Sequence, residues 1–513
     1  MAAKTYYLTT PIYYVNDVPH IGTAYTTVLA DVLARYRRGI GQGVFFLTGT
    51  DEHGQKAEDA AKKRGLTPQA HCDELQQRFR DAWTRLEITN DDFVRTTEPR
   101  HVKVVQAALD LLWKKGEIYA GEYEGWYHAG DEIFVTEKDI EERGLDRAKL
   151  RRVAERNYFF KMGAYRERLV AHIESHPSFI RPEHRRNEIL GFLKKGLDDL
   201  CISRPKSRLA WGIPLPFDDD FVTYVWFDAL LNYVSVPGFL TDPARFATLW
   251  PADVHLMGKD ILTTHAVYWP TMLMALGVEL PKTLLAHGWW TLGGDKMSKS
   301  LGNVVNPLSY ADRFGVDALR YFFVREMNVG QDAEFSDERF RARYDADLGN
   351  DWGNLLSRSL TMIGKFSDGK VPAPASPGGG PSGAREAAKA AASRLASHLD
   401  DFQPQRIAED AMAILRAGNQ HVDATQPWKA AKDPAKAGFV RDALYTLAEA
   451  VRVASVLLSP ITPAKGAEAL RQLGVAVPTD LRAAFAWGGL VPGTAVAKGE
   501  VLFPRVEPEP TAG

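Results

Sequence analysis

The stretch KTYYLTT at positions 4–10 opens the pattern that decides the fold of this 513-residue chain. It is rich in β-branched and aromatic residues and predicts a strand. After a loop at 11–19, apolar residues recur at helical spacing over 20–36, and a second apolar strand follows at 44–47. A further helix comes next. Strand, helix, strand, helix predicts a parallel sheet with right-handed crossovers, an α/β fold.

The same pattern returns late in the chain. VHLM at 254–257 and TLLA at 283–286 each read as a buried strand before a turn or helix. Residues 116–215 have mixed patterning and many Arg and Lys residues, which indicates an insertion into a split Rossmann fold. The chain looks helical from about 306, and KVPAPASPGGGPSG at 370–383 predicts a mobile loop or linker. Alanine, leucine and charged residues then predict a helix bundle.

Composition excludes several classes of protein. The apolar fraction is 45% and the charged fraction 25%, which are globular values, and no apolar run is long enough to span a bilayer. Cys72 and Cys201 are the only cysteines, so a disulfide framework or a thiol-rich zinc knuckle is not expected. No secretory signal is visible, and we expect a cytoplasmic protein. The net charge of −2 neither supports nor excludes a nucleic-acid partner.

Two short elements carry candidate chemistry. Pro19-His-Ile-Gly-Thr23 stands where a strand gives way to a helix, whose first N–H groups favour anions. Gly22 would let a nucleotide lie against the backbone, while His20 and Thr23 could donate hydrogen bonds to phosphate. A histidine at a helix start is more often a cap or core residue. Taken alone, this element is therefore weak.

The second element is Lys296-Met-Ser-Lys299-Ser, inside a glycine-flanked loop at 293–303. Two lysines on such a loop could close over a triphosphate and neutralise the charge that develops when its α-phosphate is attacked. The alternative is a solvated basic loop. The pentapeptide is specific enough to favour catalysis by Lys296 and Lys299.

Together these elements resemble the HIGH and KMSKS signatures of class I aminoacyl-tRNA synthetases, in the right order and separated by an insertion. Thr23 replaces the second histidine of HIGH, so it cannot act as an imidazolium, although its hydroxyl could still contact phosphate. A longer resemblance covers nearly the whole chain and is to the methionyl-tRNA synthetases. Its segments are TPIYYVN at 10–16, GTDEHG at 49–54, ISRPKSRLAWGIP at 202–214 and YVWFDALLNY at 224–233.

The resemblance implies residue roles. Asp51 would pair with the substrate ammonium. The methionine pocket would consist of Ile12, Tyr14, Trp226, Ala229, Leu230, Tyr233, Ile261 and His265. A thioether packs well on aromatic edges, which these residues could supply. The family often has proline where Leu230 stands, so the pocket shape would differ there. ATP would be held by Gly22, Arg204, Gly258, Asp260, His287, Gly288, Trp289 and Lys299.

The helical half is expected to read tRNA. Asn354 and Arg358 lie one helical turn apart, and Trp428 follows Pro427 at the start of a predicted helix. By resemblance, Trp428 would stack on an anticodon base, and the other two side chains would bond base edges. Without the resemblance, a packed tryptophan and a polar helix face would be the simpler interpretation. No further module follows, so we expect a monomer.

Metal binding is expected only through ATP, which carries Mg²⁺. Many family members hold zinc on cysteine pairs in the insertion, but His128 and Asp131 stand where one pair would be, and no second pair follows. A structural zinc site needs four good ligands. We therefore predict an insertion without zinc, in which His128 and Asp131 are ordinary loop residues.

The resemblance implies ATP-dependent activation of L-methionine to methionyl-adenylate and transfer to the 3′ end of tRNA(Met). Cysteinyl or leucyl enzymes of the same class and a non-catalytic tRNA-binding paralogue remain alternatives. The predicted domains are 1–115, the first half of the Rossmann catalytic domain; 116–215, the connective insertion; 216–305, the second half with the KMSKS loop; 306–365, a stem-contact or linking region; and 366–513, the helical anticodon-binding domain.

Overall fold

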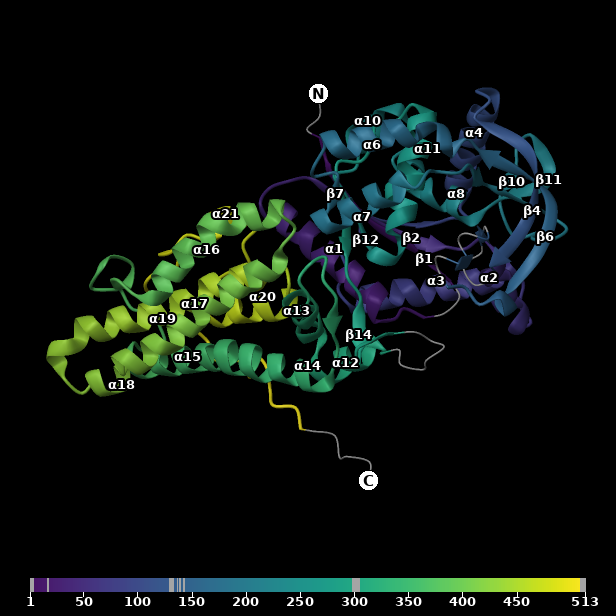
Figure 1. The fold of residues 1–513 in the computed structure, drawn as a ribbon. Helices are drawn as coiled ribbons and strands as arrows, with labels where there is room; N and C mark the ends of the chain where they lie inside the picture. Colours follow the sequence, from purple (N-terminus) through teal and green to yellow (C-terminus); the bar gives the residue numbers. More distant parts are fainter. Residues whose placement is uncertain are drawn as a thin grey trace. The chain divides into compact units, whose positions relative to one another are not determined.

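The computed structural model describes residues 4–15, 18–128, 133–135, 137, 140–141, 144–297 and 305–507. The chain forms two compact units. Unit 1 comprises Met1–Val18, Phe45–Asp81 and Asn90–Ala286, and unit 2 comprises Pro19–Val44, Ala82–Thr89 and His287–Gly513. Among the described residues, no helix combines the length and the apolar character that crossing a membrane requires. Figure 1 shows the elements of both units along the chain.

A six-stranded sheet forms the centre of unit 1. Its order is β3 (Asp92–Arg95), β2 (Val44–Asp51), β1 (Tyr6–Tyr14), β12 (Val254–Gly258), β13 (Leu284–His287) and β7 (Ile180–Arg181). The β1–β12, β2–β3 and β13–β7 pairs are parallel. The predicted α/β class is confirmed, and the predicted strands at 44–47, 254–257 and 283–286 are all present.

One predicted boundary is wrong. We expected a loop from Pro11, yet β1 continues through Pro11 to Tyr14. Proline is compatible with extended backbone where its missing N–H is not needed, and Ile12, Tyr13 and Tyr14 favour strands. Ile12 and Tyr14 therefore lie on the strand and not in the loop that the sequence predicted.

Helices α4 (Pro99–Lys114), α6 (Arg166–Ser175), α7 (Glu183–Lys194) and α11 (Trp269–Leu276) bury apolar faces in one core with this sheet. The insertion contains a four-stranded antiparallel sheet in the order β5 (Ile133–Val135), β4 (Ile118–His128), β6 (Leu150–Phe160) and β8 (Leu200–Cys201). A three-stranded sheet of β10 (Pro214–Leu215), β11 (Asp218–Thr223) and β9 (Ser203–Pro205) follows. Both small sheets belong to unit 1.

Unit 2 is mainly helical. Helices α16 (Gly383–Asp400), α17 (Pro404–Thr425), α19 (Ala437–Leu458) and α20 (Pro463–Gln472) pack successively, and α15 (Leu355–Phe366) packs on α19. Helix α1 (Ile21–Gly39) and α13 (Val316–Glu326) also belong to this unit and contact each other. The predicted helix bundle is present, and α17 and α19 are its longest members among the described residues.

The segment at 370–383 differs from its prediction as a mobile loop or linker. Val371 is buried and its N–H donates to the Thr494 carbonyl, while the Trp487 indole donates to the Gly378 carbonyl at 2.8 Å. Three successive glycines at 378–380 have positive φ. A Cβ on Gly379 would collide with Thr446 of α19. The glycines therefore permit close packing here.

Candidate active site

Two aromatic rings from separate elements of unit 1 meet at the predicted methionine pocket. Tyr14 lies at the end of β1, and Trp226 lies on α8 (Val225–Leu230). Their ring centroids are 6.2 Å apart with an interplanar angle of 76°, an edge-to-face arrangement. Both side chains are half-buried, so parts of both rings face open space. Such rings suit an apolar, polarisable ligand group.

Hydrogen bonds join a second group of predicted pocket residues. His265 Nδ1 lies 2.9 Å from the Ile261 carbonyl oxygen, and its Nε2 lies 2.8 Å from the Tyr233 hydroxyl. A carbonyl oxygen only accepts, so Nδ1 carries the proton and the Tyr233 hydroxyl donates to Nε2. The imidazole is therefore held in one neutral tautomer.

Burial keeps that imidazole uncharged. Both His265 and Tyr233 are almost fully buried. Desolvation lowers the pKa of His265 to about 4, although the bond to Ile261 acts in the opposite direction. His265 lies on a π-helical turn, Thr264–Tyr268, a rare geometry that occurs often at functional sites. A neutral imidazole suits an uncharged thioether better than an imidazolium would.

Asp51 and the remaining pocket residues belong to the same unit. Asp51 ends β2, is almost fully buried, and its carbonyl accepts the Val15 N–H at 3.3 Å. It lies near enough to Tyr233 to help burial raise the pKa of that phenol. The other predicted members lie in or next to the apolar core of unit 1. Leu230 belongs to this core, Ile12 and Ile261 pack against it, and Ala229 is buried beside Leu230 in the sequence.

Several residues at this site carry roles that sequence reasoning missed. Polar contacts hold the loop after β2 in place. They are made by two residues of the loop itself, Glu52 and His53, and by Trp211 and Asp228 from other segments. All four lie inside the family segments quoted above, at 49–54, 202–214 and 224–233. The segments were therefore informative, but a linear sequence could not show which of these side chains touch one another.

In unit 2, the histidine signature forms the start of α1. His20 is the N-cap: its Nδ1 accepts the Gly22 N–H at 3.1 Å. The Thr23 hydroxyl donates to the His20 carbonyl at 2.7 Å and accepts the His20 N–H at 3.0 Å, completing a capping box. A Cβ on Gly22 would stand only 3.0 Å from the His20 ring. A larger residue at this position would therefore crowd the imidazole and require it to shift.

Residues from the other predicted nucleotide element lie against α1. The Thr26 hydroxyl is 2.7 Å from His287 Nε2, and the Tyr25 ring meets the His287 ring edge-on at 4.9 Å. Gly288 follows, and a Cβ there would overlap the backbone at Gln331. These contacts join His287 to Thr26 and Tyr25 of α1, the helix that begins after His20.

Trp289 is half-buried, and its backbone N–H donates to Asp332 at 2.8 Å. Of the other predicted ATP contacts, Arg204, Gly258 and Asp260 lie in unit 1. Arg204 is almost fully buried, with its guanidinium 4.1 Å from the Tyr224 ring and bonded to the Ser203 carbonyl at 2.7 Å. Gly258 ends β12, and Asp260 is exposed on the short helix Lys259–Ile261.

Some predicted residues lie outside the described part of the chain. Lys299 and Asp131 belong to this group, and only the backbone is described for Lys296, in β15 (Asp295–Lys296), and for His128. Their predicted roles stay predictions, as does the absence of zinc. Within the described ranges, no cluster of three or more His, Cys, Asp or Glu side chains is arranged to hold a metal ion.

The predicted anticodon residues lie in unit 2. Asn354 is exposed at the end of the π-helical segment Tyr344–Asn354, which continues directly into α15. Arg358 of α15 donates a hydrogen bond to Asp423 of α17 at 3.3 Å. Trp428 follows Pro427 on α18 (Pro427–Ala430) and is 39% exposed. The exposed part of the ring is available for stacking on a base.

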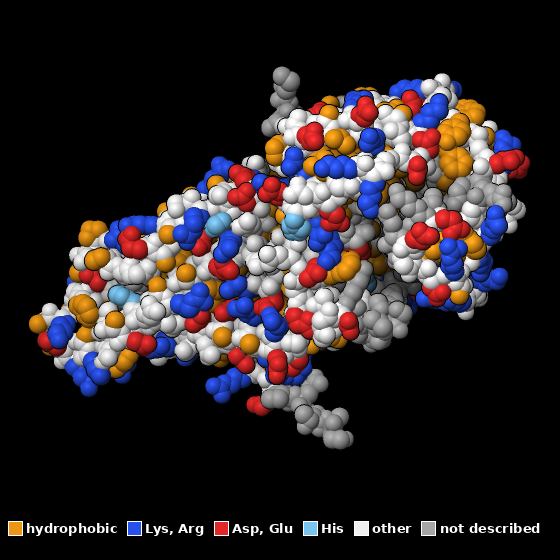
Figure 2. Space-filling model, viewed as in Figure 1, with side chains coloured by type: hydrophobic (Ala, Val, Ile, Leu, Met, Phe, Trp, Pro, Cys, Tyr) orange, Lys and Arg blue, Asp and Glu red, His pale blue; other side chains and the backbone are white. Residues whose placement is uncertain are grey.

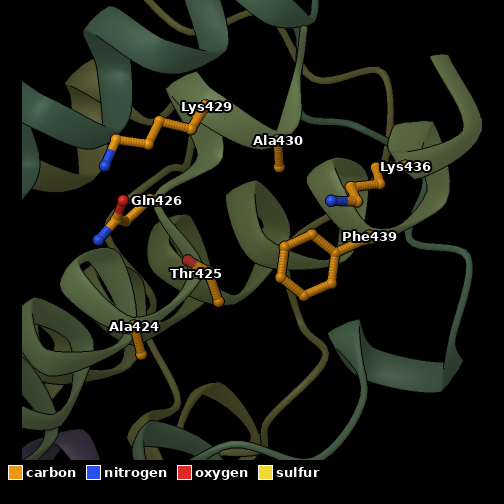
Figure 3. Close-up of a pocket in the computed structure, with 7 residues that line it drawn as sticks. All are labelled: Ala424, Thr425, Gln426, Lys429, Ala430, Lys436 and Phe439. Carbon is orange, nitrogen blue, oxygen red and sulfur yellow. The ribbon is translucent and has the colours of Figure 1, made fainter. Parts of the chain in front are cut away.

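A cavity of about 500 Å³ adjoins α18. Its lining comes from the end of α17, from α18, from the short helix Pro434–Lys436 and from the start of α19, and consists of Ala424, Thr425, Gln426, Lys429, Ala430, Lys436 and Phe439. Figure 3 shows the Lys436 ammonium directed toward the space beside the Phe439 ring. Figure 2 shows basic and hydrophobic side chains together at the end of the helical region where Figure 1 labels α18.

Comparison with known protein families gives two matches. The family described as class I tRNA synthetases (M) matches residues 6–144 and 145–360. The family described as the anticodon binding domain of methionyl tRNA ligase matches residues 371–513. Together the two matches extend over nearly the whole chain.

Curated relatives and solved structures agree with these families. The methionine–tRNA ligase of Streptomyces coelicolor is 45% identical over 99% of this chain and 98% of its own length. That of Caldanaerobacter subterraneus subsp. tengcongensis is 44% identical over 99% of this chain and 80% of its own. The Mycobacterium tuberculosis methionyl-tRNA synthetase in complex with methionyl-adenylate is 40% identical, with a TM-score of 0.91 over 98% of this chain and 100% of that one. This chain therefore belongs to the methionyl-tRNA synthetase family of the class I tRNA synthetases.

Proposed function

We propose that this chain activates L-methionine with ATP to form methionyl-adenylate and transfers the methionyl group to the 3′ end of tRNA(Met). The observation that carries the proposal is the neutral His265 imidazole bonded to Tyr233, in the unit that also holds the Tyr14 and Trp226 rings. These groups offer aromatic edges and an uncharged nitrogen to a thioether. Asp51 would neutralise the substrate ammonium.

The chemistry proceeds in two steps. A methionine carboxylate oxygen attacks the α-phosphorus in line, a new P–O bond forms, and the bond to the bridging oxygen breaks to release pyrophosphate. His20, Lys296 and Lys299 would stabilise negative charge on the transferring phosphates, and Thr23 would act through His20. In the second step, the ribose 2′-hydroxyl of the terminal adenosine attacks the adenylate carbonyl, and AMP leaves.

The sequence predicted that the Thr23 hydroxyl donates to phosphate, but its hydrogen bonds favour a different role. Its single hydroxyl proton is given to the His20 carbonyl. Its main contribution would therefore be to fix the His20 backbone, so that the imidazole meets the phosphates in one orientation. Gly258, Asp260, His287, Gly288 and Trp289 would hold the adenosine, and Arg204 would contact phosphate. ATP would bind together with Mg²⁺, because the negatively charged triphosphate itself coordinates the ion.

Pyrophosphate exchange tests the first step. The wild-type chain should exchange pyrophosphate with methionine and with none of the other nineteen amino acids. Lys299→Ala should reduce kcat by roughly two to three orders of magnitude with little change in the KM for methionine, because a contact made only in the transition state is lost. Unchanged exchange in that variant would remove Lys299 from the mechanism.

On the tRNA side, Asn354, Arg358 and Trp428 would read the anticodon. The cavity beside α18 supports this proposal, since Lys429 and Lys436 could neutralise a backbone phosphate while the exposed Phe439 ring accepts a base face. Lys429→Gln with Lys436→Gln should weaken binding of a tRNA(Met) anticodon stem-loop and reduce the salt dependence of that binding. Lys432→Gln is the matched control, because Lys432 is exposed nearby but does not line the cavity.

Family membership leaves the cysteinyl and leucyl alternatives without support. A non-catalytic paralogue would bind tRNA but show no pyrophosphate exchange. A monomeric state and a cytoplasmic location also belong to the proposal. Sedimentation at micromolar concentration would test the first, and localisation of a tagged chain would test the second.

A further inference from the structure

Buried contacts hold the loop that follows β2, which begins next to Asp51, to two other parts of unit 1. Glu52, next to Asp51, is fully buried, and its carboxylate accepts two N–H groups of Arg95 at 2.7 and 2.9 Å and the Thr97 hydroxyl at 2.6 Å. The backbone N–H of Glu52 donates to the Thr96 hydroxyl at 2.9 Å. Because the buried Glu52 carboxylate is hydrogen-bonded to both Arg95 and Thr97, the backbone at Glu52 is held in one conformation.

The other side of the loop reaches α8. His53 Nδ1 lies 2.8 Å from Asp228 Oδ2, and Asp228 is fully buried. The second carboxylate oxygen of Asp228 accepts the Ala229 N–H at 2.9 Å. Asp228 stands two residues after Trp226 on the same helix. The contact therefore joins the loop that carries Asp51 directly to the helix that carries Trp226.

Trp211 closes the arrangement from a third segment. Its indole N–H donates to the Glu52 carbonyl at 2.5 Å, and its own carbonyl accepts the Gly54 N–H at 3.2 Å. The Trp211 and His53 rings lie 5.5 Å apart. Contact with this ring excludes water from one side of the His53–Asp228 bond, and a bond shielded in this way is stronger than an exposed one.

We propose that His53 and Asp228 form a positioning pair that sets the separation between Asp51 and the Trp226 ring, and through it the affinity for methionine. The inference rests on the function proposed above. Neither residue needs to touch substrate. In methionine, few bonds separate the ammonium from the thioether, so a pocket that binds both groups must hold its carboxylate and its aromatic wall at a fixed distance.

Substitution of His53 tests the pair. His53→Leu removes the hydrogen bond and should raise the KM for methionine about tenfold in pyrophosphate exchange, while the KM for ATP stays unchanged. His53→Asn places an amide N–H near the position of Nδ1 and should restore most of the methionine affinity. This selective loss with rescue is not expected of a residue that only stabilises the fold.

Two further variants keep the test decisive. Asp228→Asn preserves shape but not charge and should show the same selective rise in the KM for methionine, which provides a second measurement if His53→Leu does not fold. Tyr158→Phe is the matched control: it removes the hydrogen bond of 2.7 Å from the Tyr158 hydroxyl on β6 to Asp218 on β11, in the same unit but outside the loop after β2 and outside α8. It should lower Tm without changing either KM.

An unchanged KM for methionine in both Asp228→Asn and His53→Leu, or an equal rise in the KM for ATP, would overturn the inference. The proposed function fails separately. If the wild-type chain shows no methionine-dependent exchange, the function itself is wrong, whereas normal wild-type exchange with insensitive variants removes only the positioning pair.

Discussion

The Tyr233 hydroxyl donates a hydrogen bond of 2.8 Å to Nε2 of His265, and both side chains are buried. The bond exists in this direction because the Ile261 carbonyl already accepts the proton on Nδ1 at 2.9 Å. The relationship sets the tautomer, the charge and the orientation of the imidazole together. It also makes the proposed methionine pocket sensitive to the loss of a single oxygen atom.

Tyr233→Phe should raise the KM for methionine about tenfold, because Nε2 of His265 would lose its donor in a buried site, at a cost of roughly 1–3 kcal/mol. The KM for ATP should not change. Steady-state pyrophosphate exchange at varied methionine concentration measures the effect. A rise in both KM values would indicate a general loss of structure instead of a local one.

Stability should fall on acidification, because unit 1 contains buried neutral histidines. Burial lowers the pKa of His265 to about 4 and that of His101 to about 3, from 6.5 in the unfolded chain. Below pH 6.5 the unfolded chain therefore binds more protons, and stability is lost progressively until the folded-state pKa is reached. By linkage, His265 alone contributes a loss of about 3 kcal/mol between pH 6.5 and pH 4.

Guanidinium chloride unfolding at pH 7 and pH 5 measures this slope. His101→Asn should reduce the slope, because a group that titrates differently in the two states is removed. The same slope in that variant as in the wild type would contradict the assignment of His101 as a buried neutral histidine.

The most buried ion pair described in unit 2 should be costly to break. Asp31 of α1 and Arg320 of α13 are both fully buried, with 2.6 Å between carboxylate and guanidinium, and Arg320 also donates to the carbonyls of Leu86 and Ile461. Arg320→Ala should destabilise unit 2 by about 3–5 kcal/mol, because the buried carboxylate keeps only Arg35 as a cationic partner and the carbonyls of Leu86 and Ile461 lose their buried donor. Chemical denaturation measures the loss.

Arg471→Ala provides the comparison for that variant. Arg471 pairs with Glu468 at 2.6 Å on the surface of the same unit, with 59% of its side chain exposed. An exposed pair contributes about 0–1 kcal/mol, so this variant should be close to the wild type in stability. Similar losses in the two variants would show that burial does not set the difference.

Trp428→Ala should separate the two activities of the chain. Loss of a base-stacking ring costs roughly 1–3 kcal/mol, so kcat/KM for tRNA charging should fall about tenfold or more. Pyrophosphate exchange should remain at the wild-type level, because the ring lies on α18 of the helical region. Equal loss of both activities would show that Trp428 is structural.

Sequence patterns predicted a large share of the fold. The strands at 44–47, 254–257 and 283–286 and the helix after His20 could be predicted because hydrophobic periodicity is a local property. The end of β1 and the packed segment at 370–383 could not. In both places proline or glycine, which usually marks a turn, sits in backbone that tertiary contacts hold in place.

The sequence by itself determined the α/β class, the family and the residue types of the proposed pocket, because these follow from local periodicity and from motifs that can be recognised in one dimension. Only the tertiary structure decided which tautomer His265 adopts, where the Thr23 hydroxyl proton goes and that His53 meets Asp228. The last of these partners stand 175 positions apart. Hydrogen-bond direction and burial depend on neighbours that the chain brings together only when it folds.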